Sequence, residues 1–153
     1  MSQFPGARRH LVLGLQIIMN NILNDPLIFM LMKAIIMVES GNDPAAIGDS
    51  GQAYGCMQIH AILVRDVNRI ANTSYVHEDA FDEDKSRRMF YEYSKHYARR
   101  LQVLEGRPPT FEDIARNWNG GPDGFKKECS KPYWGRVQLA LESLISNGDG
   151  LGY

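Results

Sequence analysis

The stretch MVESGNDPAAIGDSGQAYGCMQI, residues 37–59, decides how this chain folds. It begins where an apolar segment, residues 26–38, ends. That segment is apolar on nearly every side, which predicts a helix buried on more than one face, and Asp25 before a proline is a typical helix start. Gly41 and the Asn-Asp-Pro that follows predict the end of the helix. Glu39 is therefore expected on the last turn of a buried helix, where lost hydration and the helix dipole disfavour its ionised form.

A glycine-punctuated loop follows this helix. Gly48, Gly51 and Gly55 alternate with polar residues that include Asp49 and Tyr54. A loop of this composition can bring backbone amides and a few polar groups close to a ligand. Taken alone, a glutamate at a helix end is most often solvated and glycines most often mark turns. Neither feature by itself defines a function.

The composition limits the classes of protein to consider. With 153 residues and 44% hydrophobic content, the chain can bury one core, so a single domain and a monomer are expected. A net charge of −1 argues against the basic surface that nucleic acid requires. No charge-free apolar run is long enough to span a bilayer, so no stable membrane insertion is expected.

The cysteines and histidines give no metal signal. Cys56 and Cys129 lack paired metal-ligand spacing, and two buried thiols are expected, with a single bridge as the alternative in an oxidising compartment. The four histidines do not cluster, so neither a metal nor a cofactor is expected. The N-terminus has the basic start and short apolar stretch of a signal peptide, but Gln16 interrupts it and no cleavage site follows, which favours an ordinary first helix and leaves the export route open.

Hydrophobic periodicity predicts a mostly helical protein. Helices are expected over residues 10–23, 26–38, 60–71, 82–104, 110–119 and 132–145. Residues 72–81 are interpreted as a loop, and no alternating strand is found. We expect these residues to face inward on the last four helices: Ile62, Leu63, Val67, Ile70, Met89, Phe90, Tyr93, Tyr97, Leu101, Leu104, Phe111, Ile114, Ala115, Trp118, Trp134, Val137, Leu141, Leu144 and Ile145. The chain is divided into an N-terminal extension with a short helix (1–24), a main domain (25–147) and a tail (148–153).

Several motifs together resemble one family. Glu39-Ser40-Gly41, then Pro44-x-Ala46, Gly51 and Gly55-x-Met57-Gln58-Ile59 are similar to the first two motifs of the soluble lytic transglycosylases and goose-type lysozymes. The turn NWNGGP at residues 117–122 resembles a third motif, Ala-Tyr-Asn-Ala-Gly-Pro, with Trp118 in the tyrosine position. Tyr133 resembles the tyrosine of the last motif, whose hydroxyl approaches the glutamate. The resemblance covers residues 26–145 and implies a mostly α, lysozyme-like single domain.

The resemblance also implies an activity. A lytic transglycosylase cleaves the β-1,4 bond between N-acetylmuramic acid and N-acetylglucosamine in peptidoglycan and leaves a 1,6-anhydro product. Glu39 would be the general acid and then the base, since a carboxyl group of raised pKa can protonate the leaving oxygen. The partner would be the glycan strands of peptidoglycan, met at the cell wall or in the periplasm. The expected substrate-binding residues are Ser40, Gln58, Asn119, Tyr54, Tyr133 and Asp49.

Two alternatives stay open at this stage. A hydrolytic, goose-type-like lysozyme would use Asp49 to hold water opposite Glu39, although an aspartate between glycines also fits a turn that bonds its own backbone. A non-catalytic wall-binding or phage structural module would keep the fold without the chemistry. Trp118 and Tyr133 can also be interpreted simply as core aromatics.

Overall fold

The computed structural model describes residues 26–148. The expected helix over residues 10–23, the Asp25 cap and the segment after residue 148 lie outside the described residues, so the proposed division into extension, domain and tail stays a prediction. Within the described part, the fold is mostly α, with five α-helices and one small sheet. The α-helices are α2 (Pro26–Ser40), α3 (Ala61–Ala71), α4 (Glu83–Glu105), α5 (Phe111–Gly120) and α6 (Lys131–Ser146).

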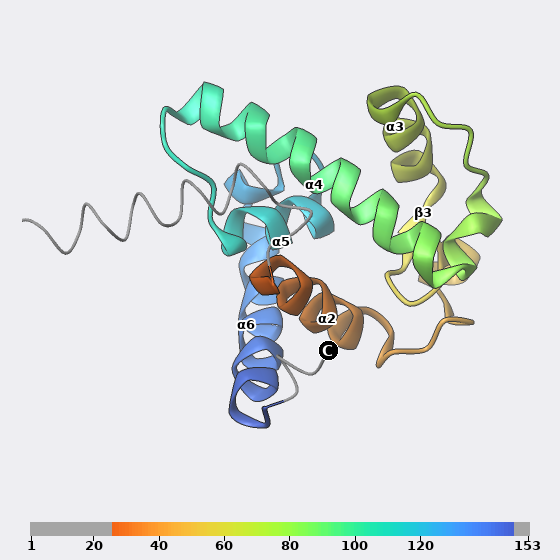
Figure 1. Ribbon diagram of the computed structural model, residues 1–153, viewed down its shortest axis with the longest axis horizontal. Coiled ribbons are helices and arrows are strands. Elements are labelled where there is room, and N and C mark those ends of the chain that lie inside the picture. Colours follow the sequence, from red (N-terminus) through yellow and green to blue (C-terminus); the bar gives the residue numbers. More distant parts are fainter. Residues whose placement is uncertain (1–25, 149–153) are drawn as a thin grey trace, which may run out of the picture.

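Helix α2 is the buried centre of the domain. Its residues 28, 30–32 and 34–36 are at most 5% exposed, as expected for a segment that is apolar on nearly every side. Helix α6 lies beside α2 (Figure 1), and α5 also packs against both of them. At its C-terminal end α2 stops at Gly41, whose φ is +63°. This left-handed residue turns the chain away and leaves Glu39 on the last turn of the helix.

Helix α4 spans the molecule and joins its two ends. It contacts α3 and α5, which lie along different parts of its length (Figure 1). The side chain of Asp82 accepts a hydrogen bond from the backbone N–H of Lys85 and caps the first turn. The predicted inward stripe from Met89 to Leu101 is buried, but Leu104 is 57% exposed and does not belong to the core.

A small antiparallel sheet lies between α2 and α3, and the sequence did not predict it. Its strands are β1 (Ile47–Gly48), β2 (Ala53–Tyr54) and β3 (Ile59–His60), in the order β1-β2-β3. Ile47 pairs with Tyr54, and Ala53 pairs with His60. The expectation of no strand is wrong because strands of two residues are too short to produce a visible alternation. The sheet turns the glycine loop into a defined wall.

Short 3-10 helices complete the connections. They are η2 (Asp49–Gly51), η3 (His77–Phe81), η4 (Gly124–Lys126) and η5 (Glu128–Ser130). Residues 72–81 are thus only partly a loop. Gly55 packs on η3 so closely that a β-carbon there would lie 1.8 Å from the backbone oxygen of Ala80, and its φ is +75°. Only glycine fits that position without moving the backbone.

Three other expectations are corrected. Ile62 is 69% exposed and Ile145 is 60% exposed, so neither faces the core. Cys56 is buried as expected, but Cys129 is exposed, and both thiols are free. No helix in the described part of the chain is long and apolar enough to cross a membrane.

Candidate functional site

A cleft of about 810 Å³ opens beside the end of α2. Its lining residues come from the end of α2, η2, the small sheet, α3, α4, α5 and the turn that follows α5. Its lining combines acidic, basic, amide and apolar side chains. The lining residues are Glu39, Asp49, Ala53, Gln58, His60, Ile62, Leu63, Arg65, Asp66, Arg69, Tyr93, Tyr97, Trp118, Asn119, Gly121 and Pro122.

Glu39 is the most perturbed acid of the cleft. Burial raises its pKa from 4.5 to about 7, against the opposing effects of a hydrogen bond from Tyr133 and the positive charge of Arg136. The Tyr133 hydroxyl donates to Oε1 of Glu39 over 2.7 Å, and burial beside this carboxyl raises the pKa of Tyr133 well above its usual value. Loss of water therefore outweighs two interactions that favour the carboxylate. Near neutral pH, Glu39 is present both as acid and as carboxylate.

Asp49 also lines the cleft and lies in a turn with unusual backbone angles. Asp49, Ser50 and Gly51 all have positive φ, at 48°, 54° and 87°. This conformation is costly for residues with a side chain and persists where the surrounding structure holds it. Oδ2 of Asp49 lies 3.3 Å from Nε2 of His60, on β3. The turn therefore presents the Asp49 carboxylate across the sheet, beside a histidine.

The other predicted site residues divide into two groups. Gln58 and Asn119 line the cleft with Glu39 and Asp49, but the Gln58 amide donates to the carbonyl of Gly55 over 2.9 Å and so also fixes the loop. Ser40 and Tyr54 are not part of the cleft lining.

Ser40 and Tyr54 are engaged within the fold instead. The Ser40 hydroxyl donates to the carbonyl of Cys56 over 2.8 Å and accepts from the backbone of Asp43. The Tyr54 ring is stacked on His77, with 3.9 Å between ring centroids, and on Phe81. Both side chains therefore hold the glycine loop in place, and a direct ligand contact from either has no geometric support.

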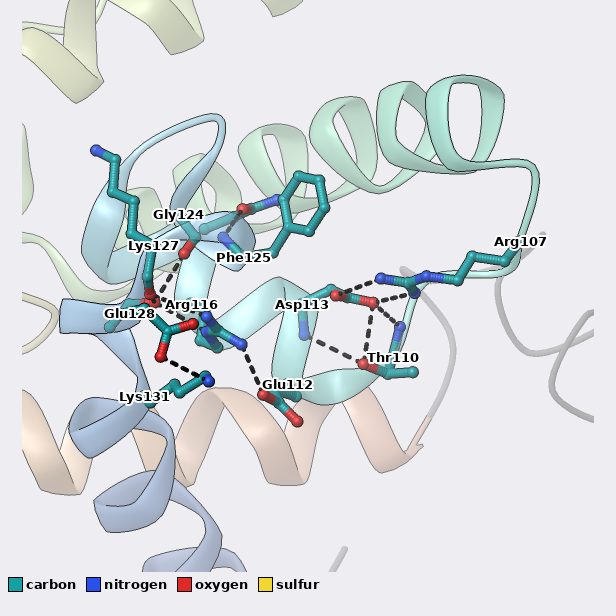
Figure 2. A network of polar contacts seen from close by, with 12 residues as sticks. Arg107, Thr110, Glu112, Asp113, Arg116, Gly124, Phe125, Lys127, Glu128 and Lys131 are labelled. Atoms are coloured by element: carbon teal, nitrogen blue, oxygen red, sulfur yellow. Dashed lines mark hydrogen bonds and ion pairs between the residues drawn. The ribbon is translucent and has the colours of Figure 1, made fainter.

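A polar network around α5 (Figure 2) holds this helix, which carries Asn119, and the segment that follows it. At the start of α5, Thr110 and Asp113 form the predicted capping box, and Arg107 makes two hydrogen bonds to the Asp113 carboxylate. One turn later Arg116, only 7% exposed, binds three groups of the following segment and of α5. They are the Ser130 hydroxyl at 2.8 Å, the Lys127 carbonyl at 2.9 Å and the Glu112 carboxylate at 2.8 Å.

Several cleft residues were not predicted from the sequence. His60, Arg65, Asp66 and Arg69 lie on β3 and α3. Arg65, Asp66 and Arg69 follow helical spacing, and this spacing is the only sequence signal that could have revealed them. Charged residues at helical spacing usually mark a solvated face of a helix, so the signal does not indicate a cleft. Trp118 lines the cleft and also packs edge-on against Phe90, with 5.2 Å between ring centroids, so it belongs both to the core and to the cleft wall.

The lining is suited to a polar ligand rich in hydrogen-bonding groups. Glu39 can donate as an acid or accept as a carboxylate, the aspartates accept, and the arginines donate. Trp118 and Leu63 add apolar surface. Among residues 26–148, no three His, Cys, Asp or Glu side chains gather as a metal ion would require.

Comparison with known proteins gives a match to a solved structure. No protein-family model matches the chain, and no curated protein sequence matches it. A solved chain from the crystal structure of Aeromonas hydrophila PliI in complex with Meretrix lusoria lysozyme is 29% identical, with a TM-score of 0.60. The match covers 72% of this chain and 87% of that chain.

This match corrects the functional identification made from the sequence motifs. The similar chain comes from a complex of PliI with a lysozyme, not from a transglycosylase, so assignment to the soluble lytic transglycosylases and goose-type lysozymes is wrong. The predicted enzyme activity and the peptidoglycan partner rested on that resemblance alone and are corrected with it. Short motifs such as those around Glu39 and Asn119 match unrelated sequences often enough that they do not establish a family by themselves.

Proposed function

We propose that this protein functions by binding a partner protein in its cleft. The two proteins would form a complex similar to that of PliI with lysozyme. The observation that carries the proposal is the match itself, which spans 87% of a chain in that complex. The cleft supports it, because a concave surface with both donors and acceptors can receive a protruding segment of another protein.

The proposal gives the site residues definite roles. Glu39, Asp49 and Asn119 would contact the inserted segment, while Tyr133 and Gln58 would hold Glu39 and the glycine loop in position. The proposal also describes the fold as lysozyme-like and places the protein at the cell wall or in the periplasm, where a lysozyme acts.

Separate calorimetric titrations of this protein with Meretrix lusoria lysozyme and with Aeromonas hydrophila PliI test the proposal. We expect a one-to-one complex with one of the two. If this protein binds the lysozyme and slows the clearing of cell walls by it, this protein is the inhibitor of the pair. If it binds PliI instead, it is the member of the pair that PliI recognises.

A matched pair of variants tests whether the cleft is the contact surface. Asn119→Trp places a bulky ring on the exposed rim of the cleft, and Gln138→Trp places the same ring on the exposed surface of α6. We expect the first to weaken binding at least about tenfold and the second to leave it unchanged. Binding to neither protein refutes the proposal.

A further inference from the structure

One face of α3 lines the cleft although it contributes nothing to the core. Ile62, Arg65, Asp66 and Arg69 follow the spacing i, i+3, i+4 and i+7, and all four belong to the cleft wall. The buried residues of the same helix, Val64 and Val67, point into the core. The helix thus has a packing face and a second face directed at whatever occupies the cleft.

Two of the three charged residues on this face are already satisfied. Oδ1 of Asp66 accepts from Nε of Arg69 over 3.1 Å and from its Nη2 over 2.5 Å. Oδ2 of Asp66 accepts from the Tyr97 hydroxyl. Asp66 and Arg69 therefore neutralise each other.

Arg65 is different. It is exposed, and no hydrogen bond or ion pair joins its guanidinium to another residue in the part of the chain that the structure describes. The other carboxylates of the cleft are engaged elsewhere, Glu39 by Tyr133 and Asp49 by His60. Arg65 therefore presents to the cleft a guanidinium whose planar set of donors is not engaged by any other described residue.

An apolar surface adjoins this charge. Ile62, one helical turn before Arg65, is 69% exposed, and Leu63 next to it also lines the cleft. A guanidinium beside an exposed aliphatic side chain is complementary to a carboxylate that is itself next to an apolar group. Arginine binds carboxylates with two parallel hydrogen bonds, which adds direction as well as affinity.

We propose that Arg65 and Ile62 form a subsite for an acidic side chain, flanked by an apolar residue, on the partner segment that enters the cleft. The inference rests on the proposed function and specifies the chemistry of the partner. It requires Arg65 to change from a solvated cation to the anchor of an ion pair in the complex.

Variants of Arg65 test this subsite in the complex. Binding of whichever partner protein forms the complex is measured with wild type, Arg65→Gln, Arg65→Lys and the control Arg88→Gln, which removes an exposed arginine of α4 outside the cleft. We expect Arg65→Gln to weaken binding about tenfold, Arg65→Lys to weaken it less, and Arg88→Gln to leave it unchanged. The difference between wild type and Arg65→Gln should shrink at 0.5 M salt, since salt screens exposed charges.

A second measurement works without the partner protein. The Arg65 Nε–H resonance and the Ile62 methyl resonances are followed during titration with N-acetyl-Leu-Glu-amide and, in parallel, with N-acetyl-Leu-Gln-amide. We expect saturable shifts with the glutamate peptide only, and none in Arg65→Gln. If neither PliI nor the lysozyme binds wild type, the proposed function fails while this titration still decides on the subsite. If a complex forms but Arg65→Gln binds as wild type does, or both peptides behave alike, Arg65 is a solvated surface arginine and the subsite is refuted.

Discussion

Replacing Glu39 by glutamine should stabilise the protein at high pH and not at low pH. The Glu39 pKa is about 7 in the folded protein against 4.5 as its ordinary value, so between these pH values the folded chain holds a proton that the unfolded chain has lost. Stability of the wild type must then fall as pH rises through this window. Glutamine carries no such charge, and its side-chain oxygen can still accept the hydrogen bond from Tyr133.

The size of the effect follows from the two pKa values. A tenfold change in an ionisation constant corresponds to about 1.4 kcal/mol, so the shift from 4.5 to about 7 corresponds to at most roughly 3–4 kcal/mol. We expect the free energy of unfolding of Glu39→Gln minus that of wild type to increase by up to this amount between pH 4 and pH 8.

Urea denaturation, followed by tryptophan fluorescence at pH values from 4 to 8.5, measures this difference. Glu78→Gln is the matched control, because Glu78 is exposed on η3 and its replacement should give a pH profile parallel to that of wild type. Parallel profiles for wild type and Glu39→Gln would show that Glu39 is an ordinary solvated acid, as would a carboxyl-carbon NMR titration with a midpoint near 4.5.

Three further predictions concern single contacts. Tyr133→Phe removes the donor that stabilises the Glu39 carboxylate and should raise the Glu39 pKa above about 7; an unchanged or lower value by NMR would contradict the bond. Gly55→Ala drives a β-carbon into η3 and should cost roughly 2–4 kcal/mol of stability. Gly51→Ala is the control, since the space around Gly51 is open, and it should cost only about 1 kcal/mol. Equal losses in urea denaturation would show that the close contact at Gly55 is absent. Arg116→Met leaves buried acceptors without their donor and should cost roughly 2–4 kcal/mol, with faster amide exchange over residues 121–130; a loss below about 0.5 kcal/mol would show that Arg116 does not hold this segment.

Much of the helical framework could be predicted from the sequence. Helices α2 to α6 begin and end close to the positions that capping residues, glycines and hydrophobic periodicity indicate, and the capping box of Thr110 and Asp113 is present. These signals are local, since a cap or an apolar stripe acts within a few residues. The sheet was missed because its two-residue strands are defined by pairing between residues 47–60 and not by any run of side chains.

The cleft could be predicted only in part, for a related reason. The last turn of a buried helix indicates an acid of raised pKa at position 39, because that argument needs only the neighbouring sequence. The charged face of α3 becomes part of the cleft only when α3 packs against α4, and local patterns do not determine that packing. The family resemblance was wrong for a similar reason, because it rested on a few short local motifs. The comparison over most of the chain does not support that family.

The bond between Tyr133 and Glu39 joins residues 94 positions apart, which bears on when the cleft forms during folding. Contacts of large sequence separation are generally made late, because the loop between them must first be closed. Until α6 docks beside α2, Glu39 lacks both the burial and the hydroxyl donor, and it titrates as an ordinary glutamate. At about pH 6 docking of α6 must therefore draw one proton from solution, so a pH indicator in a refolding experiment would report completion of the cleft as a separate event from the earlier gain of helix.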